Sequence, residues 1–560
     1  MTRKKNSLSE LLFVPLGGIG EIGMNLALYG YGPEEDREWI AIDCGVSFAG
    51  PDFPGADLIF PDTRFLEEEK HALKGIVITH AHEDHYGALL DLWPRLNKVP
   101  VYATAFTAAL LAAKREGEAG APKIPVEIFA AGDRFKVGPF EIEAINVTHS
   151  IPEPVALAIR SPAGTVVHTG DWKLDATPEL GKPTDEKRLR EIGDEGVLAM
   201  IADSTNALRE GVSPSEREVS ASLGDIIRGA KGRVAVTTFS SNVGRIRSIA
   251  AAARDAGRQV LLMGRSMQRV CDVSRELGYL EGLPPFLGEQ DFGYIPPEKA
   301  VIILTGSQGE PRAALARLSR GDHPSVSLSR GDLVIFSSRS IPGNEKGIIE
   351  IQNALIERGV EVLEDGAKLV HVSGHPRRGE MRQMYEWVRP KIAIPAHGEA
   401  AHLTAHAKLA KEMGVREVIP VRNGGLVRLS PGAATIIDEV PVGRLYKDGR
   451  LIGSAEDMGI NERRRLSLVG QVSVLVELTA KLQMREDPDL VALGLPKDDA
   501  GGEDLEDLLI DAAAGAVESI PPNRRKDLDL VAESVRRAVR GAAFQAWGKK
   551  PIVTVFVIRS

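Results

Sequence analysis

The chain is poor in cysteine and in long apolar runs. Cys44 and Cys271 are its only cysteines among 560 residues, too few for a disulfide framework or a cysteine-rich zinc site. No apolar run approaches the roughly 20 residues that a membrane-spanning helix needs. The basic start, Met1 to Lys5, is not followed by the apolar stretch of a secretory signal. We therefore expect a cytoplasmic protein without a membrane segment, in which histidine and carboxylate groups hold any metal.

An excess of positive charge is also missing. The formal net charge is −9, whereas binding of nucleic acid draws on clustered lysine and arginine. A nucleic-acid partner would therefore need a local attraction, and divalent cations in a cleft can supply part of it. The length of 560 residues predicts a protein of several domains.

Two kinds of pattern divide the chain. Residues 11–205 contain short β-rich runs separated by glycine and proline turns, with helical stretches near Tyr86–Leu96 and Thr104–Glu116. From about Pro214 the pattern becomes strand, polar turn and amphipathic helix, which is typical of a parallel, doubly wound sheet. Strand-like segments, KLVHVSGH and KIAIPAHG, follow within 368–398, and the end of the chain predicts a small separate α/β module.

The most informative motif is GIVITHAHEDH at 75–85, an apolar strand that runs into three histidines and an aspartate. Residues two apart at a strand end face the same side, so His80 and His82 can hold one ion, while Asp84 and His85 at the next helix turn toward a second. Imidazole and carboxylate ligands suit zinc, and sites containing oxygen also accept manganese. The spacing favours a dinuclear centre over a chance cluster of surface histidines.

Further ligands are expected where other strands end in loops. His149 follows FEIEAINVT and Asp171 follows VVHTG, at positions where ligands commonly leave a rigid scaffold. Asp171 is the expected bridging carboxylate, and His397 in KIAIPAHGE is the expected remaining ligand of the second ion. Asp43, after WIAI, is better placed to orient a ligand histidine or a water. For any one of these residues alone, a capped turn is the plain alternative.

Two other features are set aside. Gly18, Gly20 and Gly23 match the G-x-G-x-x-G fingerprint of dinucleotide-binding folds, but MNLALYGYGP after them alternates like a strand, and pyrophosphate binding needs a helix N-terminus there. Four histidines in charged or helical contexts are predicted to be solvated: His71, His323, His402 and His406.

With these residues in hand, the chain resembles the metallo-β-lactamase superfamily, and within it the β-CASP nucleases, most closely the bacterial ribonuclease J family. The residues that resemble the four superfamily motifs are, in order, Asp43; the string His80, His82, Asp84 and His85; His149; and Asp171. The three β-CASP motifs resemble Asp203 in IADSTN, His375 in VSGHPRRGE and His397 in PAHGE. The chain departs from the family after His375, where Pro376, Arg377 and Arg378 stand in place of small residues.

The resemblance implies an α/β fold, a metallo-β-lactamase αββα sandwich with an inserted β-CASP doubly wound α/β domain and a small C-terminal α/β domain. The expected boundaries are 1–208 and 367–440 for the two parts of the metallo-β-lactamase domain, 209–366 for the β-CASP domain, 441–465 for a linker and 466–560 for the C-terminal domain. The insertion would explain why His397 lies so far along the chain from the other ligands. The C-terminal domain would assist assembly into a homodimer or homotetramer.

The resemblance also implies a two-metal ribonuclease that hydrolyses RNA phosphodiester bonds. It would remove nucleotides 5′ to 3′ from single-stranded RNA bearing a 5′-monophosphate, would cut internally as well, and would act in ribosomal RNA processing and messenger RNA decay. Two divalent ions per subunit are expected, Zn²⁺ first and Mn²⁺ as the alternative. Such a centre suits phosphate, because two ions less the charges of Asp84, Asp171 and hydroxide leave a net positive charge.

By the resemblance, His375 lies opposite the metals, where it would stabilise the transition state or protonate the leaving oxygen, with Asp203 as its orienting partner. Asp84 is grouped with these two as catalytic. The strands of the doubly wound region end in small polar turns that open helices, whose free N–H groups favour anions. The expected RNA- or phosphate-binding residues are Ser240, Ser241, Asn242, Gly264, Arg265, Ser266, Gly306, Ser307, Gln308, Glu310, Ser337, Ser338 and Ser340, and the HVSGH turn of His371, Val372, Ser373, Gly374 and His375. Pro311 is the expected first helical residue after the third turn.

Two other functions stay open. A metallo-β-lactamase-type hydrolase of a small ester or thioester would use the same metal residues, but it would not need the inserted domain. A metal-stabilised RNA-binding or scaffold protein would bind RNA without turnover. Cleavage of 5′-monophosphorylated RNA with Mn²⁺ or Zn²⁺ tests the first, and retention of RNA binding after His80→Ala and Asp84→Ala tests the second.

Overall fold

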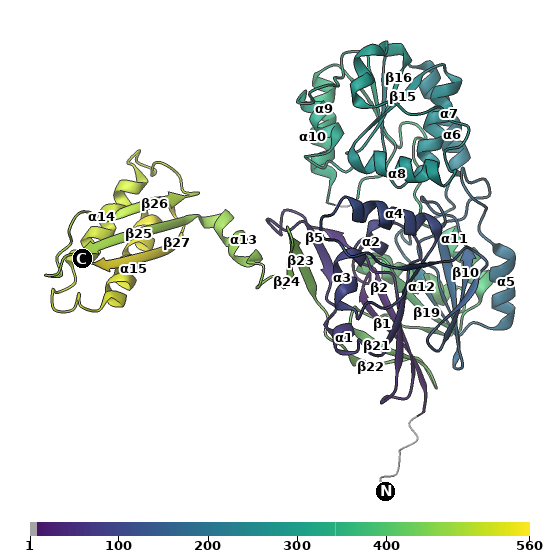
Figure 1. Ribbon diagram of the computed structural model, residues 1–560, viewed down its shortest axis with the longest axis horizontal. Helices are drawn as coiled ribbons and strands as arrows, with labels where there is room; N and C mark the ends of the chain where they lie inside the picture. Colours follow the sequence, from purple (N-terminus) through teal and green to yellow (C-terminus); the bar gives the residue numbers. More distant parts are fainter. Residues whose placement is uncertain (1–7, 342) are drawn as a thin grey trace, which may run out of the picture. The chain divides into compact units, whose positions relative to one another are not determined.

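A computed structural model describes residues 8–341 and 343–560 (Figure 1). The chain divides into two compact units, one of the residues up to Ser47 with Phe60–Gly443 and one of Phe48–Ile59 with Arg444–Ser560. None of the helices in the described part of the chain combines the length and apolarity that a membrane span requires.

Two sheets lie face to face in the first unit. The first has the order β22-β21-β1-β2-β3-β6-β7-β8, with β1 (Glu10–Gly17), β2 (Leu26–Gly32), β3 (Glu38–Ile42), β6 (Leu73–Val77), β7 (Val101–Ala103), β8 (Val126–Ile128), β21 (Gly425–Ser430) and β22 (Thr435–Glu439). The second has the order β20-β19-β13-β12-β11-β10-β9, with β9 (Arg134–Val137), β10 (Phe140–Asn146), β11 (Val155–Ser161), β12 (Gly164–His168), β13 (Ala199–Asp203), β19 (Ile392–Ala396) and β20 (Glu417–Val418). One core joins their inner faces, including Phe13 and Ile40 of the first sheet and Leu157 and Ile394 of the second.

Helices cover the outer faces of this sandwich. Against the second sheet lie α5 (Glu186–Glu195), α11 (Arg378–Val388) and α12 (Ala400–Glu412), whose buried side chains share a cluster with that sheet. On the side of the first sheet are α1 (Arg64–Glu68), α2 (Glu83–Tyr86), α3 (Leu89–Leu92) and α4 (Ala105–Glu116) (Figure 1). The 3₁₀ turn η1 (Trp93–Arg95) follows α3 directly. Phe65 of α1 packs edge-on against Trp39 of β3, with ring centroids 5.5 Å apart. The layers confirm the predicted αββα sandwich, although the helix expected near Tyr86–Leu96 is divided into short pieces.

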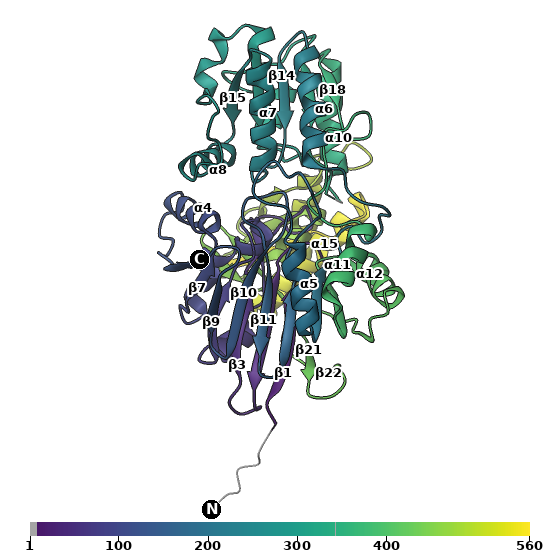
Figure 2. The ribbon, with the colours of Figure 1, turned by 90° about the vertical axis from the view of Figure 1, so that its right-hand side faces the viewer.

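An inserted domain separates β13 from β19 (Figure 2). Its sheet is parallel throughout, in the order β15-β16-β14-β17-β18, with β14 (Val234–Thr237), β15 (Gln259–Met263), β16 (Ala300–Leu304), β17 (Leu333–Phe336) and β18 (Glu361–Leu363). Its helices are α6 (Glu216–Gly229), α7 (Val243–Asp255), α8 (Arg265–Glu276), α9 (Ala314–Arg320) and α10 (Glu345–Glu357), with 3₁₀ turns η2 (Glu289–Tyr294) and η3 (Pro297–Lys299). The chain then returns to the sandwich, where Ala396 of β19 pairs with Asp203 of β13. The return delivers His397 to the end of the second sheet, as the insertion predicts.

Two local predictions are wrong. KLVHVSGH, at 368–375, forms a loop and not a strand. Its Val370 carbonyl accepts hydrogen bonds from Ser337 Oγ and Arg245 Nη1. This carbonyl therefore bonds to side chains and not to the backbone of a neighbouring strand. Helix α9 begins at Ala314, so Pro311 lies in the turn before it.

A buried network of charges ties the inserted domain to the sandwich. Lys173, which follows β12, lies 3.3 Å from carboxylate oxygens of both Asp175 and Glu216. Glu216, at the start of α6, accepts a hydrogen bond of 2.6 Å from Arg245 Nη2 of α7. None of these four side chains is more than 7% exposed. Because buried charges are tolerated only when they are paired and hydrogen-bonded, this network links α6 and α7 of the inserted domain to the segment after β12.

The second unit holds a hairpin and a small α/β module. The hairpin strands β23 (Arg444–Asp448) and β24 (Leu451–Gly453) form a sheet with β5 (Leu58–Pro61) and β4 (Ser47–Phe48). With α13 (Ile460–Val469), they give regular structure to the segment expected as a linker at 441–465. The module is a sheet of order β26-β25-β27, with β25 (Gln471–Leu478), β26 (Asp489–Leu493) and β27 (Ile552–Arg559), packed against α14 (Leu505–Glu518) and α15 (Leu528–Trp547).

Candidate metal centre

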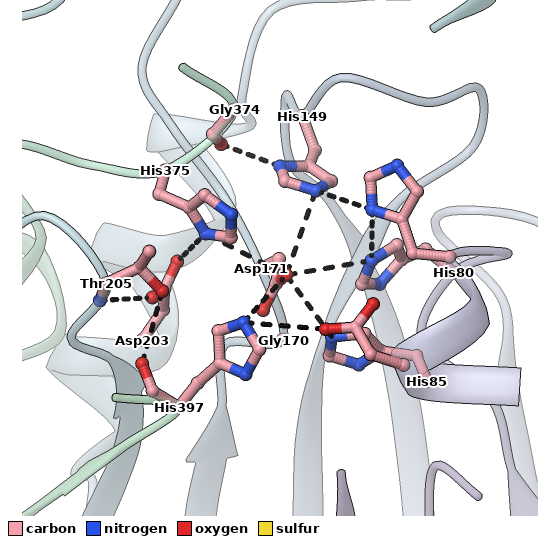
Figure 3. A network of polar contacts seen from close by, with 12 residues as sticks. His80, His85, His149, Gly170, Asp171, Asp203, Thr205, Gly374, His375 and His397 are labelled. Atoms are coloured by element: carbon pink, nitrogen blue, oxygen red, sulfur yellow. Dashed lines mark hydrogen bonds and ion pairs between the residues drawn. The ribbon is translucent and has the colours of Figure 1, made fainter. Parts of the chain in front are cut away.

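Side chains from the ends of several strands converge at one edge of the sandwich (Figure 3). Seven of them form two groups that share Asp171: His80, His82, His149 and Asp171, and Asp84, His85, Asp171 and His397. Asp171 also forms a smaller set with Asp203 and His375. Within each group the potential ligand atoms lie within 4.8 Å of one another. The structure therefore brings together all the residues that the sequence suggested as ligands, including His397 from the far side of the insertion.

Asp171 stands at the centre of both groups. Its Oδ2 lies 3.2 Å from His85 Nε2 and 3.5 Å from His397 Nε2, and 3.8 Å from the Nε2 atoms of both His80 and His149. Its other oxygen, Oδ1, is buried without a hydrogen-bond partner in the described residues. An unpartnered buried carboxylate oxygen costs free energy, which a bound cation would relieve. This geometry suits a bridging carboxylate.

The spacing of the first group fits metal binding. His82 Nδ1 lies 3.1 Å from His80 Nε2 and 3.0 Å from His149 Nε2. Ligands on a tetrahedral zinc with nitrogen bonds of about 2.05 Å are roughly 3.3 Å apart. Burial lowers the pKa of His80 and of His149 well below the usual value, and that of His82 to about 4. The three rings are therefore neutral at physiological pH and offer lone pairs.

Each ligand ring outside His82 is oriented through its second nitrogen. The Nδ1 atoms are held by Thr79 Oγ1 for His80 (3.0 Å), Gly374 O for His149 (2.6 Å), Asp43 Oδ2 for His85 (2.7 Å) and Asn25 Oδ1 for His397 (2.9 Å). A fixed Nδ1 leaves Nε2 directed at the carboxylate, which is how outer partners set a ligand's tautomer and orientation. Asp43 has the geometry of the expected orienting group. Sequence analysis missed Asn25 and Thr79, although Thr79 lies inside the GIVITH motif.

The glycine-rich loop at 17–23 supports this centre. As expected, the strand β2 follows it and no helix does. Gly18 O accepts a hydrogen bond of 2.7 Å from His397 N, and Gly20 N donates to Gly398 O at 3.0 Å. At Gly18, where φ is +84°, a Cβ would lie 2.2 Å from Asn25 Oδ1. Glycine is thus required for the loop to lie against Asn25 and His397.

Opposite charges compensate one another in the second group. Burial opposes a charged His85, but the carboxylates of Asp171, Asp84 and Asp43 outweigh it and raise its pKa well above the usual value. Burial would raise the pKa of Asp171, yet His397, His85 and His375 hold it well below the usual range. Divalent cations would take over this compensation and displace the protons. The donor set therefore fits a divalent metal.

His375 and Asp203 form a pair beside the two groups (Figure 3). His375 Nδ1 lies 2.7 Å from Asp203 Oδ2, whose other oxygen accepts from Thr205 N at 2.8 Å. Asn206 Nδ2 holds the turn by donating to Ser373 Oγ and to His375 O. Burial opposes protonation, but Asp203 and then Asp171 raise the pKa of His375 to about 9. The ring is thus protonated near neutral pH and can donate a proton.

Apart from the HVSGH turn, the residues expected to bind RNA share one edge of the inserted sheet. All strands of that sheet are parallel, so the turns after them meet at the same edge. Ser240, Ser241 and Asn242 follow β14, Gly264, Arg265 and Ser266 follow β15, Gly306, Ser307, Gln308 and Glu310 follow β16, and Ser337, Ser338 and Ser340 follow β17. Ser337 and Arg245 bond to Val370, so this edge contacts the loop that carries the HVSGH turn.

Many side chains of these turns are already occupied. Asn242 Oδ1 caps α7 by accepting from Arg245 N at 3.0 Å. Gln308 Nε2 donates to Arg339 O at 2.8 Å, and Glu310 Oε2 accepts from Gln308 N at 2.9 Å. Such bonds fix the shape of the turns, and they occupy backbone N–H groups as well, since Asn242 N donates to Phe239 O and Ser337 N to Thr237 O.

One histidine expected to be solvated is deeply buried. His406 of α12 is 1% exposed and contacts Ser204 Oγ at 2.8 Å and Tyr385 OH at 2.9 Å. Burial lowers its pKa to about 4. The side chain of His323 is also nearly buried, 3.5 Å from Glu289. Both predictions failed because α12 and the loop before β17 are covered by segments distant in sequence.

Family models match the chain in consecutive segments. They are described as a beta-lactamase superfamily domain at residues 38–248, a ribonuclease J beta-CASP domain at 231–355, a Zn-dependent metallo-hydrolase RNA specificity domain at 359–420 and a ribonuclease J C-terminal domain at 458–560.

Similar proteins extend over nearly the whole chain. Proteins named ribonuclease J are 62% identical in Sinorhizobium meliloti, covering 98% of this chain and 97% of the relative, and 40% identical in Mycolicibacterium smegmatis, covering 97% and 96%. The one from Thermus thermophilus is 36% identical, covering 97% and 94%. A crystal structure described as a protein of unknown function from Enterococcus faecalis V583 covers 75% of this chain and 100% of its own, with a TM-score of 0.53 at 16% identity, which shows likeness of fold alone.

Proposed function

The chain belongs to the ribonuclease J family, and from this premise we propose that it degrades single-stranded RNA 5′ to 3′ from a 5′-monophosphate end and also cuts RNA internally, in RNA processing and decay. It is a metal-dependent ribonuclease. The observation that carries the proposal is the position of Asp171 Oδ2, within 3.8 Å of imidazole nitrogens from both ligand groups. A carboxylate surrounded in this way suits a pair of cations acting on one phosphate.

We propose two divalent ions per chain, Zn²⁺ first and Mn²⁺ as the alternative. His80, His82 and His149 would hold one ion, Asp84, His85 and His397 the other, and Asp171 both. When bound, such ions lower the pKa of water and neutralise charge on the scissile phosphate. The outer partners, Asp43, Thr79 and Asn25 among them, keep the imidazoles oriented with their lone pairs inward.

His375 serves as the general acid in this proposal. Its proton is available because Asp203 and Asp171 raise its pKa to about 9, and its side chain is 21% exposed, which leaves it open to substrate. Asp203 holds Nδ1, so Nε2 is free to face the leaving oxygen. Asp84, whose side chain is 30% exposed, lies at the more open side, where its carboxylate can orient an entering water.

We propose that the HVSGH turn and the backbone of the inserted-sheet turns receive the 5′-terminal phosphate. Support comes from His371, whose Nδ1 is buried without a partner among the described residues. Burial, and then the charge of Arg245, lowers the pKa of His371 to about 3, so the ring is neutral and keeps one N–H for a ligand oxygen.

The test compares RNAs labelled at the 5′ end and bearing one or three 5′ phosphates, with Mn²⁺ or Zn²⁺ added. Early release of labelled mononucleotide from the monophosphorylated RNA is expected, with internal fragments from the triphosphorylated RNA. A hydrolase of small esters or thioesters would cleave neither RNA. If the protein is an enzyme, we expect His80→Ala and Asp84→Ala to abolish RNA cleavage and to leave RNA binding intact. If it is a scaffold, the wild-type protein should not cleave RNA either.

We further propose that the protein acts in the cytoplasm as a homodimer or homotetramer. Both cysteines are buried and unpaired, as suits a reducing compartment. In the C-terminal module, α14 and α15 pack on one face of the sheet. The other face exposes Val491, Leu493, Phe556 and Ile558. Exposed apolar side chains on one face of a sheet favour an interaction surface, and a second copy can cover them symmetrically. Light scattering should give a multiple of the chain mass, reduced to the monomer by Leu493→Asp with Phe556→Asp.

A further inference from the structure

Three arginines gather beside the HVSGH turn without an acidic partner. Arg209 lies in the loop after β13, Arg377 comes two residues after His375, and Arg339 follows β17 of the inserted domain. Across residues 8–341 and 343–560, no carboxylate lies within the 4.0 Å of an ion pair with any of the three. Arg209 and Arg339 are exposed and Arg377 is half-buried, so a ligand in solution can reach all three residues.

Neighbouring arginines of α11 show the contrast. Arg378 Nε lies 2.5 Å from Glu210, and Arg382 Nη1 lies 3.3 Å from the same carboxylate. Arg378 reaches Glu412 as well, at 3.1 Å. Acidic side chains thus pair with these two arginines of α11 and with none of the three in the cluster.

Hydrogen bonds tie the cluster to the catalytic turn. Arg339 Nη1 donates to Asn206 Oδ1 at 3.2 Å, and Asn206 in turn donates to Ser373 Oγ and His375 O. Arg377 Nη1 donates to Val212 O at 3.3 Å, while Arg209 O accepts from Arg378 N at 2.9 Å. Arg209 lies in the loop that leads from β13 into the insertion, Arg339 after β17 of the inserted sheet and Arg377 just before α11, so the cluster joins segments of both domains.

The three charges repel one another. Burial and then the charge of Arg377 lower the pKa of Arg209, and burial and then Arg209 lower the pKa of Arg339. Asp365 opposes both effects, but it lies beyond ion-pair distance. In a chain of net charge −9, three neighbouring guanidinium groups without acidic partners form a local positive site that would attract an anion.

We infer that Arg209, Arg339 and Arg377 form a binding site for a backbone phosphate of the RNA, next to the phosphate that is cleaved. This inference rests on the proposed ribonuclease function. Guanidinium groups present planar pairs of donors that match phosphate oxygens. The cluster lies one hydrogen-bonded residue from His375, so a phosphate held there would position its neighbour for cleavage. The site supplies the local positive charge that the acidic composition otherwise lacks.

The test compares two substrates and matched variants. The triple variant Arg209→Gln, Arg339→Gln and Arg377→Gln is measured on single-stranded 5′-monophosphorylated RNA and on bis(p-nitrophenyl) phosphate, which has only the scissile phosphate. We expect the KM for RNA to rise about 100-fold, and the slope of log affinity against log salt to flatten by about 0.7 for each phosphate that the variant no longer neutralises. Hydrolysis of the small diester should stay within twofold. Arg382→Gln, which removes the same charge from a paired arginine on α11, should leave both substrates within twofold.

Single variants keep the test decisive if the triple variant does not fold. Arg377→Gln should raise the KM for RNA about tenfold, and Arg377→Lys should recover part of that loss because the charge remains. An unchanged KM and salt slope for RNA would overturn the inference, and so would an equal loss on the small diester or in Arg382→Gln. Failure of the wild-type protein to cleave RNA with any metal would instead remove the proposed function, so the two failures are distinguishable.

Discussion

The metal centre and the polar edge of the inserted sheet are built in opposite ways. In the centre, His85 and His397 commit Nδ1 to neighbours and keep Nε2 directed at Asp171. At the edge of the inserted sheet, the side chains of Asn242 and Gln308 form hydrogen bonds with the protein's own backbone. A residue of suitable type can therefore bind a ligand only where the fold leaves one of its polar atoms without a partner in the protein. The predictions below test this difference between the two regions.

The largest effect is expected for Asp171→Asn, which keeps the shape of the side chain and removes its charge from both ligand groups. Cleavage of RNA should fall to the background rate, because metal-ion catalysis contributes several kcal/mol of transition-state stabilisation. The measurement is kcat/KM for RNA together with a thermal unfolding profile. Activity within tenfold of wild type would show that Asp171 does not hold the centre together.

His375→Ala should reduce kcat by about 10²- to 10⁴-fold, the usual contribution of a general acid. Because its pKa is raised to about 9, the acid form is present below that pH and is lost as the pH rises through it. Asp203→Asn removes the main charge that raises this pKa, so the alkaline limb of the pH–rate profile should move to lower pH. An alkaline limb in the same position in Asp203→Asn would contradict the pairing.

Glu216→Gln should destabilise the inserted domain by about 3–5 kcal/mol, since it leaves Arg245 and Lys173 buried without their carboxylate. Burial opposes its ionisation, but Arg245 and Lys173 lower the pKa of Glu216 from 4.5 to about 2. Its contribution is therefore complete above pH 4.5 and is lost as the pH falls through about 2. Urea unfolding at several pH values measures this effect.

The matched control for this network is Asp225→Asn on the same helix, at a side chain that is 78% exposed. It should change the free energy of unfolding by less than about 0.5 kcal/mol. A wild-type stability that falls in parallel with that of Glu216→Gln below pH 4.5 would mean that the network carries no linked charge.

Asn25→Ala should weaken metal affinity by about 10- to 100-fold, as is usual when a partner that orients a ligand histidine is removed. Asn25 holds His397 Nδ1 and also donates to Asp84 O at 3.0 Å, so it steadies two residues of the second group. Competition with a chelator measures the affinity. An unchanged affinity would confine Asn25 to a structural role in the glycine-rich loop.

The smallest effect is expected at the inserted-sheet edge. Asn242→Ala removes the cap of α7 and should cost about 1 kcal/mol of stability, while the KM for RNA changes less than twofold. A tenfold rise in that KM without a loss of stability would show that this side chain serves RNA and would remove the contrast with the metal centre.

Functional residues could be predicted from the sequence where residues close together in the chain determine the site. The spacing of His80, His82, Asp84 and His85 at a strand end fixes their directions. The strand and turn around His397 indicated a ligand there, and the family resemblance supplied the insertion that brings it to the site. Prediction failed where long-range contacts decide. KLVHVSGH has the apolar pattern of a strand, yet the Val370 carbonyl is taken by Arg245 and Ser337.

Other roles depend on residues distant in sequence. Asn25 gains its role only because the chain brings His397 to it, and His406 is buried because Ser204 and Tyr385 lie over it. Arg377 is visible in the sequence as a departure from the family pattern. Its neighbours Arg209 and Arg339 become visible only in the folded chain.

The most direct test of the account is the metal content of active protein, measured by elemental analysis for the wild type and for His397→Ala. We predict about two equivalents of divalent metal per chain in the wild type, about one in the variant, and loss of RNA cleavage with the second equivalent. Full RNA cleavage by protein that holds no divalent ion, or a metal content unchanged by His397→Ala, would contradict a centre assembled across the insertion.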